Sequence, residues 1–234
     1  MKRIFLSILI FLNFTSSANE IVVSGIKESM NSHISYLVLK EAYEALGFNL
    51  VWKPLADDSS LRPANQGQVD GELHRIDGIQ KQYTNLIKVP TRINKMQATA
   101  VSHDKNLKIN GWSSLSKYRV GVRKGILFSE RGTKGMKTTV AETNDELFKM
   151  VDSKRIDVAV FSRVNVISTK KENKELAVFE LRPFIQEYNI YHYLHKKNKS
   201  LVFKLNTVLL KMHENGRIDQ IRERYIDKIT GKHE

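Results

Sequence analysis

The fold class is decided by residues 21–54, which read IVVSGIKESMNSHISYLVLKEAYEALGFNLVWKP. A β-rich run at 21–26 is followed by apolar residues at helical spacing, and a second β-rich run covers 48–52. Ser32 is the expected N-cap of the helix, Gly47 is expected to close it, and Pro54 is expected to end the second strand. This strand–helix–strand order predicts an α/β protein with a parallel sheet.

The rest of the chain continues the alternation of strands and helices. Thr143 and Glu146 form a capping box, in which each side chain is expected to bond the other's backbone N–H, so a helix should start there. Gly125 should open another helix, and two helices should close the chain on either side of Gly216. Further strands are predicted at 69–73, 93–101, 118–122, 156–161, 178–181 and 188–194.

Length and composition are those of a folded protein. The chain has 234 residues, of which 41% are hydrophobic and 27% are charged, which suits one large domain or two lobes of about 100 residues each. There is no cysteine. Disulfides, thiol catalysis, cysteine-ligated metals and a lipoprotein anchor are therefore excluded.

The N-terminus has the three parts of a secretory signal peptide. Lys2 and Arg3 precede an apolar run at 4–14, and small residues lead to Ala18. Residues 1–18 are therefore expected to be removed during export, and the mature protein is expected in the periplasm without a lipid anchor. The alternative is a buried N-terminal helix, but the run is too short to span a bilayer.

The chain is strongly basic, with a formal net charge of +13. Loss of residues 1–18 removes Lys2 and Arg3 and no acid, which leaves +11. A charge of this size can indicate a nucleic-acid or membrane partner. The basic residues are spread along the whole chain, however, so no nucleic-acid partner is expected.

Four stretches together resemble family 3 of the bacterial extracellular solute-binding proteins, the receptors of amino-acid-type ABC importers. They are QVDGE at 68–72, YRVGVRKG at 118–125, DSKRIDVAV at 152–160 and LNTVLLKMHENGRIDQIRERY at 205–225. The resemblance implies the type II periplasmic binding protein fold, with two α/β lobes joined by two crossover strands. Lobe 1 would comprise 19–97 plus 189–234, and lobe 2 would comprise 98–188. A small solute would bind between the lobes, which would close by a hinge motion.

Ligands of open parallel sheets bind beyond the carboxyl ends of the strands. Four loops leave such ends, at 27–29, 72–75, 123–126 and 161–163. The candidate ligand-binding residues in these loops are Glu28, Glu72, Arg75, Arg123, Lys124, Gly125 and Ser162. Gly125 would let the backbone approach a ligand, and the helix that follows it would offer N–H groups to an anion. The alternative for the charged residues is a solvated surface position.

The sequence departs from the family at both anchors for an α-amino acid. The resemblance implies an arginine for the carboxylate and an aspartate for the ammonium, but these columns fall near Ile79 and on Ser162. Serine cannot neutralise a buried ammonium. A simple α-amino acid is therefore not the expected ligand, and Arg75, the nearest arginine, is expected to hold an anionic group.

No enzyme motif accompanies these loops: the chain has no Gly-x-Ser-x-Gly elbow, Walker A loop or His-Glu-x-x-His helix. His192 and His195 fall in a predicted strand, where their spacing puts them on opposite faces, so no shared metal is expected. No cofactor is expected, and the protein should be a monomer that serves an ABC permease. The alternatives are a sensory module that signals to a membrane partner and an enzyme built on the same fold.

Overall fold

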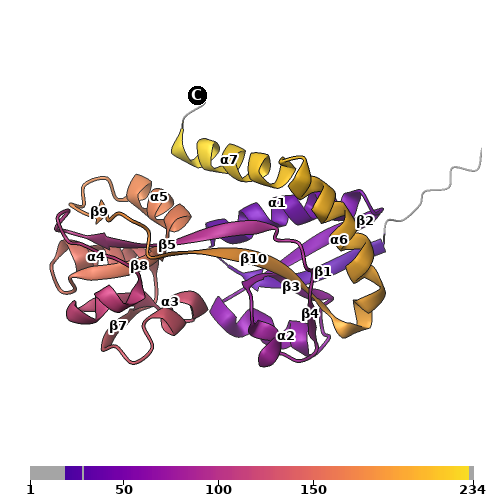
Figure 1. The fold of residues 1–234 in the computed structure, drawn as a ribbon, viewed down its shortest axis with the longest axis horizontal. Coiled ribbons are helices and arrows are strands. Elements are labelled where there is room, and N and C mark those ends of the chain that lie inside the picture. Colours follow the sequence, from indigo (N-terminus) through magenta and orange to yellow (C-terminus); the bar gives the residue numbers. More distant parts are fainter. Residues whose placement is uncertain (1–18, 28, 232–234) are drawn as a thin grey trace, which may run out of the picture.

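The computed structural model describes residues 19–27 and 29–231, and Figure 1 shows that they form two lobes side by side. Two long strands, β5 (Asn94–Ser102) and β10 (Gln186–His195), run from one lobe to the other and pair antiparallel. The predicted signal peptide lies outside the described residues. No helix in the described part of the chain has the length and apolar character needed to cross a membrane.

The first lobe, called lobe 1 below, is built on the N-terminal strands. Strand β1 (Asn19–Ile26) lies between β2 (Phe48–Leu55) and β3 (Gly71–Ile76) and is parallel to both, while β4 (Leu86–Lys88) pairs with β10. Its helices are α1 (Met30–Glu44), α2 (Leu61–Asn65), α6 (Lys199–Glu214) and α7 (Arg217–Thr230). The predicted parallel α/β unit at 21–54 is therefore confirmed.

The second lobe, lobe 2, repeats this plan on a smaller scale. Strand β6 (Val120–Arg123) lies between β7 (Thr138–Ala141) and β8 (Val158–Ser162) and is parallel to both. Strand β8 and the short β9 (Phe179–Glu180) pair with β5. The helices are α3 (Leu127–Gly132), α4 (Asn144–Asp152) and α5 (Arg163–Glu172). One continuous strand order, β2-β1-β3-β10-β5-β8-β6-β7, results.

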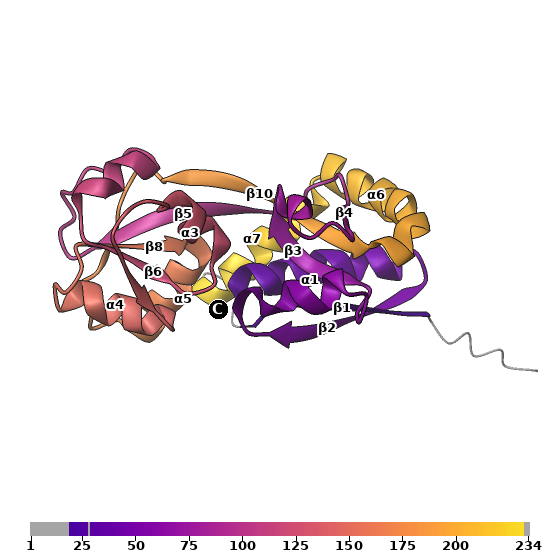
Figure 2. The ribbon, with the colours of Figure 1, turned by 90° about the horizontal axis from the view of Figure 1, so that it is seen from below.

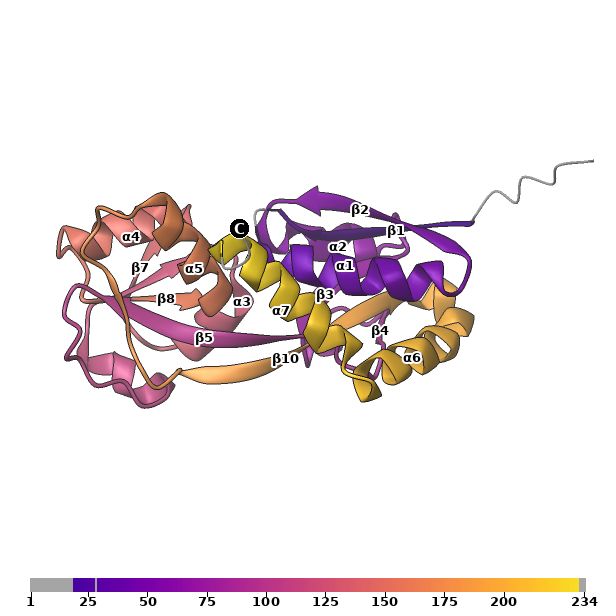
Figure 3. The ribbon, with the colours of Figure 1, turned by 90° about the horizontal axis from the view of Figure 1, so that it is seen from above.

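The C-terminal helix α7 leaves lobe 1 and reaches the junction of the lobes. Figures 2 and 3 show it running diagonally across α1 toward α5. Near this junction the Tyr225 hydroxyl lies 3.3 Å from Met30 Sδ, and the Met30 amide donates to Asn165 Oδ1 of α5 at 3.4 Å. The lobes therefore touch through α1, α5 and α7 as well as through the crossover strands.

Several predicted element ends were wrong, among them the one at Gly125, because Ile126 and not Gly125 is the N-cap of α3. Ser32 does not cap α1, because Ser29 has the extended backbone of an N-cap and its carbonyl accepts from Ser32 N at 2.9 Å. The Ser32 hydroxyl instead donates to the Ile26 carbonyl at 2.8 Å. Pro54 does not end β2, which runs on to Leu55. Strand β2 is the edge of the sheet, where a residue without an N–H group is tolerated.

The predicted cap of α4 is half correct. Thr143 is the N-cap, and its hydroxyl accepts from Glu146 N at 3.1 Å. The Glu146 carboxylate reaches one residue further back than predicted and accepts from Glu142 N at 2.9 Å. The helix is anchored at its start by both side chains.

Thr143→Ala should therefore lower the free energy of unfolding by about 1 kcal/mol, because Glu146 N loses its acceptor. For a chain of this size the melting temperature should fall by about 2–4 °C. Chemical denaturation with Thr143→Ser as the matched control checks this, since serine keeps the hydroxyl. A serine variant as unstable as the alanine variant would contradict the role of the cap.

Candidate ligand-binding cleft

The larger opening between the lobes, called the outer cleft, has a volume of about 580 Å³. Lobe 1 supplies the loop after β1, the start of α1 and the end of β2. Lobe 2 supplies the end of β6, the start of α4 and one side of α5. The lining residues are Lys27, Met30, His33, Trp52, Pro54, Arg123, Thr143, Asn144, Asp145, Asn165, Ser168, Thr169 and Glu172.

The outer cleft is polar and carries both signs of charge. Lys27 and Arg123 face it from opposite lobes, and Asp145 and Glu172 line its lobe 2 side. On the lobe 1 side, His33 packs edge-to-face on Trp52 with 5.2 Å between ring centroids. Burial lowers the pKa of His33, which favours its neutral form. This cleft can therefore hold a polar group without a preference for one charge.

A second cavity, called the inner cavity, lies deeper between the lobes and has a volume of about 60 Å³. It shares the segment 26–31 with the outer cleft, because Lys27 and Met30 line the outer cleft while Ser29 and Asn31 line the inner one. Its lining is mostly apolar. The residues are Ile26, Ser29, Asn31, His74, Arg75, Ile76, Met96, Ile126, Leu127, Phe128 and Ile190.

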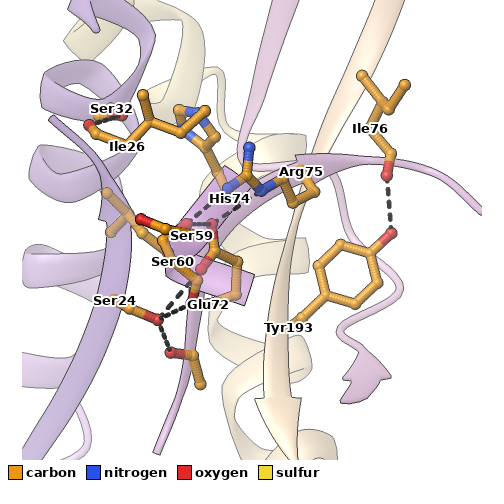
Figure 4. A network of polar contacts seen from close by, with 12 residues as sticks. Ser24, Ile26, Ser32, Ser59, Ser60, Glu72, His74, Arg75, Ile76 and Tyr193 are labelled. Atoms are coloured by element: carbon orange, nitrogen blue, oxygen red, sulfur yellow. Dashed lines mark hydrogen bonds and ion pairs between the residues drawn. The ribbon is translucent and has the colours of Figure 1, made fainter. Parts of the chain in front are cut away.

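Arg75 belongs to a buried polar network at the wall of the inner cavity (Figure 4). Its Nε lies 2.9 Å from Glu72 Oε1 as an ion pair, and its Nη2 donates to Ser60 Oγ at 2.5 Å. The Ser60 hydroxyl donates to Glu72 Oε1 at 3.0 Å, and Ser24 Oγ lies 3.1 Å from Glu72 Oε2. Glu72 is fully buried and Arg75 is 5% exposed, so the pair is shielded from solvent.

A β-bulge makes the pairing of Glu72 and Arg75 possible. Residues three apart in a regular strand point to opposite faces. Here Glu72 is opposite Tyr193 and Arg75 is opposite Tyr191, so β3 has one residue more than β10 over this interval. A bulge of this kind reorients the side chains on the strand that carries it. Burial raises the pKa of Glu72, and this effect is opposed by Arg75 and the two hydroxyls.

The other predicted residues lie in different surroundings. The Gly125 N–H donates to Glu130 Oε1 at 2.8 Å, and Lys124, which is well exposed, pairs with Glu142 at 3.0 Å. Ser162 is buried, and within the described residues its Oγ has no hydrogen-bond partner. Glu28 lies outside the described residues. The structure therefore brings Arg75 to the inner cavity and Arg123 to the outer cleft, while Lys124 lies apart.

The predictions missed several residues that line the cavities. His74 and Asn31 line the inner cavity from lobe 1, and Leu127 and Phe128 enter it from lobe 2. The apolar run at 126–128 directly after Gly125 could have signalled a hydrophobic wall. His74 gave no signal, because only its tertiary contacts place it: it is 6% exposed, and Nδ1 lies 2.8 Å from Ser35 Oγ.

The two histidines of β10 do not form a metal site. His192 is buried, with Nε2 2.8 Å from the Tyr43 hydroxyl and Nδ1 2.9 Å from the Glu72 carbonyl. His195 Nδ1 instead accepts from Lys197 N at 3.2 Å. Within residues 19–27 and 29–231, no three side chains of His, Asp or Glu come together in a way that could hold a metal ion.

Two lobes, two crossover strands and a cleft between them define the class: the chain has the type II periplasmic binding protein fold, as the sequence resemblance implied. A histidine kinase sensor domain with similarity to periplasmic binding proteins superposes with a TM-score of 0.71 at 15% identity, covering 88% of this chain and 95% of that one. The arginine-bound substrate-binding protein AbpA of an amino acid ABC transporter from Streptococcus pneumoniae gives 0.67 at 15% identity, with 91% and 96% covered.

Sequence comparison finds weaker links. An uncharacterized protein of Shewanella oneidensis is 24% identical over 205 residues, which is 84% of this chain and 77% of that protein. No family model matches the chain. The fold is therefore established by structural similarity, and the ligand has to be inferred from the cleft itself.

Proposed function

We propose that this protein is a periplasmic receptor that binds a small solute between its lobes and does no chemistry on it. The observation that carries the proposal is a cleft of about 580 Å³ that residues of both lobes line. The two lobes are joined by the crossover strands β5 and β10. Strands of this kind can act as a hinge, so a ligand that contacts both lobes would favour the closed form. The lobe boundaries near 97–98 and 188–189 fall inside β5 and β10 and stay proposals.

Transport is the first candidate role, with an ABC permease as the membrane partner, and sensing is the second. Both roles are represented among the similar structures, by a transporter receptor and by a kinase sensor domain. Deletion of the gene separates them. Loss of a transport receptor slows uptake of the ligand, whereas loss of a sensor changes a response while uptake continues.

Export is part of the proposal. The mature protein is expected to begin at Asn19, the first residue of β1, and to be recovered from the periplasm. Native mass spectrometry of protein purified from its own periplasm is the most direct test of solute binding, because a retained ligand adds its mass to the chain. Addition of that ligand to stripped protein should raise the melting temperature by mass action and should return the compound unchanged. Turnover of the compound would contradict the proposal.

The standard α-amino acids are not expected to bind with micromolar affinity. The family resemblance implies that Ser162 occupies the position of the acid that would neutralise the ammonium, and none of the described residues lining the inner cavity is a carboxylate. Losing a buried charge partner costs about 3–5 kcal/mol, or roughly two to four decades of affinity. Calorimetry with glycine, alanine, glutamine and arginine checks this, and micromolar binding of any one of them would contradict it.

The anionic group predicted for Arg75 stays untested. Its basis was the place of Arg75 at a strand end and the planar guanidinium that suits a carboxylate, and Arg75 forms an ion pair with Glu72 at 2.9 Å. A ligand carboxylate would have to compete with Glu72 for the guanidinium. Arg123, in the outer cleft, keeps its predicted place among the candidate ligand-binding residues.

A further inference from the structure

We propose that the inner cavity takes one end of an uncharged ligand, a compact apolar group next to a hydroxyl, carbonyl or amide, and that the rest of the ligand lies in the adjoining outer cleft. This inference rests on the proposed function, since it names the ligand class of the same receptor. It follows from three features of the described cavity lining. The charge of Arg75 is balanced by Glu72, the wall from lobe 2 is apolar, and the remaining polar side chains are uncharged.

The anchors that would attract a charged ligand are already engaged by carboxylates of the same chain. Arg75 pairs with Glu72 inside lobe 1, so the two together contribute no net charge to the cavity wall. The Gly125 N–H, at the turn that leads into α3, donates to Glu130 Oε1. Among the described residues that line the cavity, there is no carboxylate that could pair with a cationic ligand.

The wall contributed by lobe 2 is hydrophobic. Ile126, Leu127 and Phe128 enter the cavity from the start of α3. Leu127 also packs against the lobe 1 cluster that contains Leu61 and Tyr193, so this wall is part of the contact between the lobes. A ligand enclosed here loses most of its water, which disfavours any charge without a partner and favours apolar surface.

The polar groups that remain suit a neutral hydrogen-bonding ligand. Ser29 and Asn31 line the cavity beside His74, and all three are nearly buried. Burial lowers the pKa of His74 to about 3, so its ring is neutral at ordinary pH. A hydroxyl and an amide can each donate and accept, and they can orient a ligand that carries no charge.

Matched compounds that share one apolar group, isobutyl in the first set and benzyl in the second, test the ligand class. The first set is isocaproamide, isocaproate, isoamylamine and leucine, and the second is phenylacetamide, phenylacetate, phenethylamine and phenylalanine. In thermal melts of the mature protein at neutral pH, the amide of at least one set should give the largest rise in melting temperature. A larger rise with the acid, amine or amino acid in both sets would overturn the ligand class while supporting the receptor function. No rise with any compound would overturn the ligand class, whereas the receptor function stands or falls with the ligand that native mass spectrometry finds.

Leu127→Lys provides a second, independent measurement. It adds one cation to the half-buried lobe 2 wall, where none of the described lining residues is a carboxylate that could pair with it. The carboxylate compound of each set should therefore gain at least tenfold in affinity relative to the amide compound. Leu210→Lys on α6 is the matched control, because it makes the same change at a 45%-exposed position outside both cavities. An unchanged acid-to-amide ratio in Leu127→Lys, with folding intact by circular dichroism, would overturn the assignment of this wall to the ligand.

Discussion

Replacing Glu72 with leucine should lower the free energy of unfolding by about 3–5 kcal/mol, the usual cost of removing one partner of a buried ion pair. Glu72 is fully buried, and its carboxylate forms an ion pair with Arg75 at 2.9 Å and accepts hydrogen bonds from Ser60 and Ser24 at 3.0 and 3.1 Å. The leucine variant leaves the Arg75 guanidinium charged in lobe 1 without that counter-ion. Urea denaturation at neutral pH measures the loss.

The double variant Glu72→Leu/Arg75→Met provides the control. It removes both charges and fills similar volume with apolar atoms, and such replacements of buried pairs are often neutral or stabilising. The double variant should therefore recover most of the stability that the single variant loses. Two results would contradict this account: a single variant within about 1 kcal/mol of wild type, or a double variant as unstable as the single.

Local patterns predicted most of the strands and helices but missed β4, β7 and α5, and the arrangement in two lobes came from the family resemblance. The run at 21–54 gave β1, α1 and β2 in order, because apolar residues at a spacing of two or of three to four report directly on burial. Thr143 was recognised as an N-cap because capping depends on residues three positions apart. The long strands at 94–102 and 186–195 were predicted at 93–101 and 188–194, and the family resemblance implied two crossover strands between the lobes.

The surroundings of the candidate site could not be predicted in the same way. Strand periodicity places Glu72 and Arg75 on opposite faces, and only the bulge opposite Tyr191 and Tyr193 allows them to meet. The bond from Gly125 N to Glu130 is likewise a detail of one turn. The sequence therefore placed Arg75 and Arg123 in loops whose residues line the two cavities, but it could not show that Glu72 pairs with Arg75 in the folded chain.

Acidification should destabilise the protein at pH values well above those at which most of its carboxylates titrate. Burial lowers the pKa of His74 to about 3 and that of His192 to about 4, so both rings are neutral in the folded chain. The unfolded chain binds these protons near pH 6.5. The stability is thus fully present above pH 6.5 and falls as the pH drops toward 4. The aspartates whose pKa values are lowered in the fold, such as Asp157, reduce the stability only when the pH falls below their ordinary pKa of 3.8.

Between pH 6.5 and pH 5 the two buried histidines together should remove about 3 kcal/mol from the free energy of unfolding, about 1.6 kcal/mol for each, because the unfolded rings are already half protonated at pH 6.5. Glu72 offsets part of this loss, because its raised pKa acts in the opposite direction. His192→Asn isolates one histidine from that effect: the difference in stability between the two pH values should shrink by about 1.6 kcal/mol relative to wild type. A wild-type protein equally stable at both pH values would contradict this account, because it would mean that the His74 and His192 rings bind protons in the folded chain. The burial of both rings and the contacts of His192 with Tyr43 and the Glu72 carbonyl argue for neutral rings.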